Sequence, residues 1–126
     1  MKIYTSYYDK VPELNKDDYT FVRVSRADPP EWFSGTHACI DLSERFGPSQ
    51  AMLQECHPLE KWEVFEPRYK KEILGLLNKG TAIEAFKKIY SAFGSKPLVL
   101  LCYETAEQNC HRHLIIEFLE LERDEI

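Results

Sequence analysis

The segment Leu101–His113, LCYETAEQNCHRH, concentrates side chains that can do chemistry. It holds two of the chain's four cysteines, two of its four histidines and one arginine. A thiolate is both a nucleophile and a metal ligand, and a neighbouring imidazolium or guanidinium lowers the pKa of a thiol. Because Cys110, His111 and Arg112 are consecutive, the pattern favours an activated cysteine in a site for an anionic ligand.

The segments on either side predict where these side chains lie. Lys96–Glu104, KPLVLLCYE, is apolar at consecutive positions, which is typical of a parallel strand buried on both faces. After a short loop we expect a helix over Cys110–Arg123 with Asn109 as its N-cap. Ligands of open α/β sheets bind beyond the carboxyl ends of strands, and anions favour helix N-termini. The segment is therefore expected at a ligand-binding edge.

Helical periodicity separates the residues of this last helix into two faces. At about 100° per residue, Cys110, His111 and Arg112 fall on the apolar side. That side is otherwise made by Leu114, Ile115, Phe118, Leu119 and Leu121. A buried arginine must find an anion or lose hydration free energy, so its inward position favours function over stability. His113 falls on the polar side, where we expect it to face water and pair with Glu117.

Each of these residues, taken alone, also fits a structural role. Cys102 is compatible with a small buried apolar side chain, and His111 with a hydrogen-bonded core histidine. Arg112 could pair with Glu104 or Asp28. As a group at a strand end, these side chains favour a site over three separate structural roles.

The elements that must position this segment indicate the fold. Lys2–Tyr8 and Tyr19–Ser25 are rich in β-branched and aromatic residues and predict two further strands. Apolar residues at helical spacing predict helices over Arg68–Asn78 and Thr81–Phe93. Strands followed by helices indicate one α/β domain over residues 1–126, with a mainly parallel sheet flanked by helices.

Local signals set some boundaries and leave one segment undefined. The second helix opens with a T-x-x-E capping box, Thr81 and Glu84, and Gly94 stands at the position of a C′ glycine. Glu31–Pro67 is rich in glycine and proline, so we expect irregular structure with one short helix near Ser49–Glu55. Four aromatic side chains are expected to pack this segment down: Trp32, Phe33, Trp62 and Phe65.

Composition excludes several classes of protein. The net charge of −5 counts against a protein that binds duplex nucleic acid through many phosphates, so a nucleic-acid partner is not favoured. No apolar run is long enough to span a membrane, and the start MKIYTSYYDK lacks a signal-peptide core. Four cysteines without a secretion signal favour the reducing cytoplasm. We expect a small anionic ligand as the partner and no bound cofactor.

Two motifs resemble those of a known family. Leu100–Glu104, LLCYE, followed by Cys110–Arg112, CHR, resembles the hallmark of the domain-of-unknown-function 488 (DUF488) family. The start MKIYTS and the stretch Arg23–Arg26 before a proline-rich turn are similar as well. The resemblance implies a compact α/β domain without an assigned reaction. It places candidate site residues at Cys102, Glu104, Cys110, His111 and Arg112, with Arg23 or Arg26 from the second strand.

Three kinds of chemistry fit these residues, and the leading hypothesis is a cysteine-dependent enzyme for a phosphate-bearing or similar anionic substrate. Cys110 would be the nucleophile, His111 its base or charge partner, and Glu104 an acid or base. Arg112 and the helix N-terminus would bind the anion. In a redox variant of this hypothesis, Cys102 approaches Cys110 within disulfide reach.

The two alternatives are a binding module and a metal site. In the first, Arg23, Arg26 and Arg112 hold a nucleotide or a nucleic-acid end without chemistry. In the second, a structural metal uses the neighbouring cysteine and histidine pairs, His37 with Cys39, Cys56 with His57, and Cys110 with His111. None of these pairs has the C-x-x-C or H-x-x-x-H spacing of zinc sites, so we predict no metal ligand.

Overall fold

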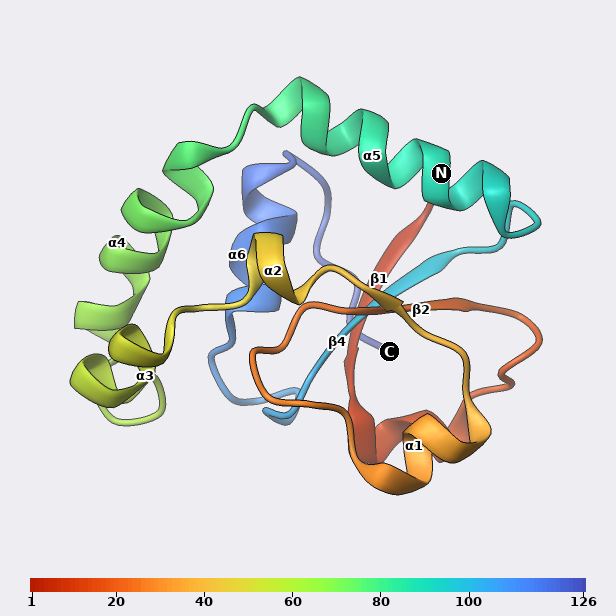
Figure 1. The fold of residues 1–126 in the computed structure, drawn as a ribbon, viewed down its shortest axis with the longest axis horizontal. Helices are drawn as coiled ribbons and strands as arrows, with labels where there is room; N and C mark the ends of the chain where they lie inside the picture. Colours follow the sequence, from red (N-terminus) through yellow and green to blue (C-terminus); the bar gives the residue numbers. More distant parts are fainter.

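A four-stranded parallel sheet forms the centre of the computed structural model, which describes residues 1–126 (Figure 1). Its strands are β1 (Ile3–Tyr7), β2 (Thr20–Arg23), β3 (Ile40–Asp41) and β4 (Leu98–Cys102). The order is β1-β4-β2-β3, so the last strand of the chain lies between the first two. Every pairing is parallel, which confirms the predicted single α/β domain and its sheet.

Strand β4 is buried on both faces, as its apolar run predicted. Leu98, Leu100 and Cys102 belong to the larger of two hydrophobic clusters, whereas Val99 and Leu101 belong to the smaller one. All five side chains are fully buried. This alternation follows from the two-residue period of a strand, and it directs the Cys102 sulfur toward the larger cluster.

Helices cover the two faces unequally. The larger cluster includes residues of α2 (Ser43–Phe46) and of the α-helices that follow it in the chain. The smaller cluster lies under the 3₁₀ helix η1 (Tyr8–Glu13) and α1 (Glu31–Thr36). Figure 1 shows α1 and the long helix α5 (Lys79–Ala92) on opposite sides of the strands.

The middle segment is more ordered than the sequence indicated. The predicted short helix is confirmed as α3 (Gln50–Cys56), where the Ser49 side chain accepts a hydrogen bond from the Met52 amide at 3.1 Å. The expectation of irregular structure elsewhere in residues 31–67 is wrong, because α1, β3, α2 and the start of α4 (Trp62–Glu72) lie there. Helices of four and six residues are too short to show a period in the sequence. Of the four predicted packing aromatics, Phe33 and Phe65 are buried, whereas Trp32 is 42% exposed.

The next two helices begin earlier than predicted. The helix expected over 68–78 is α4, which ends at Glu72 and is followed by the 3₁₀ helix η2 (Leu74–Leu76). Pro67 lies inside α4, although a proline within a helix removes one backbone hydrogen bond and crowds the carbonyl one turn earlier. The predicted capping box at Thr81 is wrong, because Asn78 is the N-cap of α5: its Oδ1 accepts a hydrogen bond from the Thr81 amide at 3.0 Å. Gly94 follows α5 with a φ of 85°, as predicted.

The last helix is shorter than predicted, and after it the chain returns to the sheet. Helix α6 spans His111–Phe118 with Cys110, not Asn109, at the N-cap. The chain turns at Glu120, whose φ is 57°, and residues 124–126 then return alongside β1. The Thr5 amide donates to the Asp124 carbonyl at 3.0 Å, which gives the edge strand a partner. None of the helices combines the length and the apolar character that a membrane crossing requires.

Candidate active site

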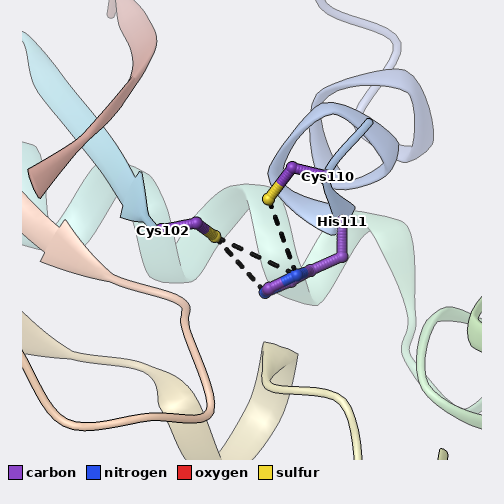
Figure 2. A group of neighbouring side chains, drawn as sticks. All are labelled: Cys102, Cys110 and His111. Carbon is purple, nitrogen blue, oxygen red and sulfur yellow. Dashed lines mark hydrogen bonds between the residues drawn. The ribbon is translucent and has the colours of Figure 1, made fainter. Parts of the chain in front are cut away.

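Two cysteines and one histidine meet at the carboxyl edge of the sheet (Figure 2). Cys102 is the last residue of β4, Cys110 caps α6 and His111 opens it. The Cys110 Sγ atom lies 3.8 Å from Nδ1 of His111, whereas Cys102 Sγ lies 3.5 Å from Nε2 and 3.9 Å from Nδ1 of the same ring. All three side chains are buried. The predicted approach of Cys102 to the CHR segment is therefore present in the structure.

A backbone carbonyl fixes the tautomer of His111. Its Nε2 lies 2.7 Å from the Val24 oxygen, which can only accept, so Nε2 carries a proton and donates it. Because Nε2 is engaged with Val24, Nδ1 is the ring atom free to exchange a proton, and it contacts Cys110 Sγ at 3.8 Å and Cys102 Sγ at 3.9 Å. Because Val24 follows β2, this bond also fastens the start of α6 to the neighbouring strand.

Cys110 has the electrostatic environment of a thiolate. Burial acts to raise its pKa, but the hydrogen bond from Cys102 and the positive charges of His111 and Arg112 outweigh burial and hold the pKa well below that of a free cysteine. Burial opposes the positive charge of His111, yet the Cys110 sulfur and the Val24 carbonyl raise the pKa of this imidazole. The site therefore favours a thiolate–imidazolium pair.

Two neighbouring groups retain protons beside that pair. Burial, together with the charge on Cys110, keeps the pKa of Cys102 well above its ordinary value, so Cys102 remains a thiol. Burial and the same negative charge raise the pKa of Glu104 to about 7. Its Oε2 lies 3.2 Å from Cys110 Sγ in a hydrogen bond. Up to a pH of about 7, Glu104 thus retains a proton next to the Cys110 sulfur.

Arg112 points inward as predicted, but its partner was not predicted. Its Nε and Nη2 donate to the Glu125 carboxylate at 3.2 and 2.8 Å, instead of pairing with Glu104 or Asp28. His113 also binds Glu125, at 3.0 Å, so its predicted exposure and pairing with Glu117 are wrong. The physical reason is the return of the tail, which offers a half-buried carboxylate to both side chains. Nη1 of Arg112 is buried without a hydrogen-bond partner.

The two arginines after β2 have different surroundings. Arg23 donates to the backbone oxygens of Ser25 and Arg26, at 3.2 and 2.8 Å, and forms ion pairs with Asp28 and Asp41. It stabilises the loop after β2 and does not line the pocket at Cys110. The side chain of Arg26 is exposed and does line that pocket.

A pocket of about 90 Å³ borders the cluster, and we call it the Cys110 pocket. One side is polar and carries Glu104, Cys110 and His111, with Arg26 and Tyr103 beside them. The opposite side comes from the middle segment and consists of Pro48, Leu53, Pro58 and Phe65. Sequence reasoning missed Pro48, Leu53, Pro58 and Tyr103 as lining residues, because no local pattern indicates which element covers a strand end. A second pocket, of about 310 Å³, borders Cys110 from the side of Trp62 and His113.

The cluster also has the composition of a metal site. The two sulfurs and one nitrogen of His111 lie within 4.8 Å of one another. A ring N–H that donates to a backbone carbonyl is the usual support of a metal-binding histidine. Cys102, Cys110 and His111 could therefore hold a thiophilic cation such as zinc. No such cluster includes His37, Cys39, Cys56 or His57.

The fold and the site together define an α/β domain with a buried cysteine–histidine cluster at the carboxyl edge of a parallel sheet. The family model described as the active DUF488-N3 subclade matches residues 10–123. The chain therefore belongs to the DUF488 family, as the LLCYE and CHR motifs indicated, and the match includes the whole site. A search of curated proteins found no match, and neither did a search of solved structures.

Proposed function

We propose that Cys110 is the thiolate nucleophile of an enzyme that acts on a small anionic, phosphate-bearing substrate. One observation carries the proposal: the Cys110 sulfur borders a pocket while it contacts both His111 and the Glu104 carboxyl. A buried cysteine with a purely structural role needs neither partner. The description of the matching subclade as active is in keeping with a chemical role.

Each group has a distinct task in this proposal. The Cys110 thiolate attacks the electrophilic atom of the substrate, and His111, held by Val24, stabilises the thiolate before attack. Glu104, with a pKa of about 7, holds a proton that it can give to the leaving group. A water molecule activated by the ionised Glu104 would then release the product from Cys110.

The preference for an anion is supported by the distribution of positive charge. Arg26 is the exposed cation at the pocket, and the unpaired backbone N–H groups at the start of α6 favour negative charge. Arg112 adds a buried charge whose Nη1 has no partner, although its other donors are occupied by Glu125. A direct contact of Arg112 with the ligand stays a prediction.

The test measures how inorganic phosphate affects alkylation of Cys110 by iodoacetamide, with each cysteine followed by mass spectrometry. The proposal predicts that phosphate slows the reaction of Cys110 and that Arg26→Gln removes this protection without changing the rate in its absence. Arg45→Gln is the matched control, because Arg45 is exposed but lines a different pocket. Equal protection by phosphate in both variants would contradict the role of Arg26. No protection in the wild type would contradict the proposal that the pocket binds an anion.

A metal site and a binding module would each give a different result on the same sample. One possible result is stoichiometric zinc whose removal by a chelator makes Cys102 and Cys110 reactive toward iodoacetamide and destabilises the protein. That result would favour a metal site over a thiolate nucleophile. Protection by phosphate without turnover of any phosphate ester or anhydride would favour a binding module without chemistry. A reactive Cys110, no metal and turnover abolished by Cys110→Ser would support the enzyme.

A further inference from the structure

We propose that Cys102 is the resolving cysteine of Cys110, so that hydrogen peroxide converts the two thiols into a Cys102–Cys110 disulfide. This inference rests on the proposed thiolate at Cys110, and it adds a two-electron oxidation that the substrate reaction does not need. The pair would switch the site off when oxidised, because the disulfide removes the nucleophile.

The geometry of the cluster carries the proposal. The two sulfurs come from different elements, yet they lie within 4.8 Å of each other and contact the same imidazole ring (Figure 2). A disulfide requires sulfur atoms about 2.05 Å apart, so a modest movement closes the bond. Cys102 is held at the end of β4, whereas Cys110 precedes α6 with an extended backbone after a loop of mostly exposed residues. The loop side is therefore the one that can move.

The Cys110 pocket is large enough to admit a small oxidant such as hydrogen peroxide. One water molecule occupies about 30 Å³ of liquid, so a pocket of about 90 Å³ admits hydrogen peroxide. Cys110 borders this pocket, whereas Cys102 does not line it and is fully buried. Peroxide would accordingly reach Cys110 first, and Cys102 would react only with the oxidised Cys110.

The two steps balance as follows. The Cys110 thiolate attacks one peroxide oxygen, the S–O bond forms, the O–O bond breaks, and the departing hydroxide takes the Nδ1 proton of the His111 imidazolium to become water. The Cys102 thiol then gives its proton to the vacated Nδ1 atom and attacks the sulfur of Cys110. The S–S bond forms, the S–O bond breaks, and the departing hydroxide takes the proton of Glu104 and leaves as a second water. Two thiols are oxidised and one peroxide is reduced to two waters.

The remaining cysteines provide internal controls. All four cysteines are free. Burial raises the pKa of Cys39 to about 11, so this thiol reacts slowly near neutral pH. Cys56 is buried on α3, where its sulfur contacts the Arg68 guanidinium at 3.7 Å. Neither residue belongs to the three-residue cluster of Cys102, Cys110 and His111.

The experiment treats the full-length protein with hydrogen peroxide and maps the products by mass spectrometry, with and without dithiothreitol. We expect two of the four thiols to disappear, a mass loss of about 2 Da and a peptide that joins residues 102 and 110, all reversed by dithiothreitol. In Cys102→Ala, Cys110 should instead progress to sulfinic acid, a gain of about 32 Da that dithiothreitol does not reverse. Cys56→Ala should behave as the wild type.

Two results would overturn the inference. In the first, Cys110 of the wild type is oxidised to sulfinic acid as fast as Cys110 of Cys102→Ala. In the second, a disulfide forms that includes Cys39 or Cys56. If Cys102→Ala does not fold, the peptide map of the wild type alone decides between these products. Rapid alkylation of Cys110 at low pH without a disulfide would refute the resolving role and leave the proposed function intact. A Cys110 inert to both reagents would refute both.

Discussion

Glu125 is predicted to be the main link between the C-terminal segment and helix α6. Its carboxylate accepts hydrogen bonds from Arg112, His113 and Thr5, and 14% of the side chain is exposed. Glu125→Gln keeps the shape of the side chain but removes its charge. Arg112 would then remain fully buried without the carboxylate that accepts its hydrogen bonds, which is a costly state.

The size of the effect follows from the pKa of Glu125. Burial opposes ionisation, but the bonds from His113, Arg112 and Thr5 lower the pKa from 4.5 to about 2. At about 1.4 kcal/mol for each pH unit, this difference corresponds to about 3 kcal/mol of folding stability. Because solvent screens a partly exposed carboxylate, we expect about 2 kcal/mol for Glu125→Gln at neutral pH. That loss corresponds to a Tm lower by about 8 °C for a chain of this size.

The pH dependence provides the second half of the assay. A carboxyl whose pKa is lower in the folded state stabilises the fold above its unfolded pKa, and this stability is lost as pH falls from about 4.5 through about 2. Urea unfolding over this range should show a smaller loss in Glu125→Gln than in the wild type, because Asp41 and Glu120, whose pKa values are also lowered, contribute equally to both proteins. Glu122→Gln, an exposed residue of the same segment, is the control. Equal stabilities of the two variants would refute the reasoning.

Two further predictions concern residues whose roles the sequence did not settle. Glu104 has a pKa raised from 4.5 to about 7, so only the folded state keeps this proton between those values and the unfolding free energy falls as pH rises. Glu104→Gln should abolish this fall in urea titrations, whereas Glu107→Gln, exposed in the same loop, should retain it. Asn78→Ala should cost about 1 kcal/mol of unfolding free energy as the loss of an N-cap, and Thr81→Ala less than about 0.5 kcal/mol. A larger loss of unfolding free energy in Thr81→Ala than in Asn78→Ala would instead support the capping box at Thr81.

The parts of the fold that depend on local pattern were predictable. The apolar run through Val99 and Leu101 indicated a strand buried on both faces, and it is the central strand β4. The meeting of Cys102 with Cys110 and His111 was also predictable, because a strand end and the start of the next helix share one edge of the sheet. Inward positions of His111 and Arg112 followed from helical periodicity alone.

The parts that depend on distant contacts were not predictable. Glu125 lies 120 residues from its partner Thr5, and nothing in an acidic segment shows which carboxylate returns to the core. The apolar side of the Cys110 pocket comes from Pro48, Leu53 and Pro58, which belong to short helices and turns without a visible period. Cys110, not Asn109, stands at the N-cap position of α6, although asparagine is the better capping residue; the Cys110 thiol makes no capping hydrogen bond and instead contacts Glu104 and His111.

The central claim is that Cys110 is a thiolate, and the rate of its alkylation against pH tests this claim most directly. Native protein would react with iodoacetamide from about pH 5 to about pH 9, with each cysteine followed separately and zinc measured on the same sample. We predict that Cys110 already reacts at the acidic end of this range while Cys39, Cys56 and Cys102 do not, and that no metal is present. A Cys110 that reacts only near the pH of an ordinary thiol, in metal-free protein, would contradict the claim.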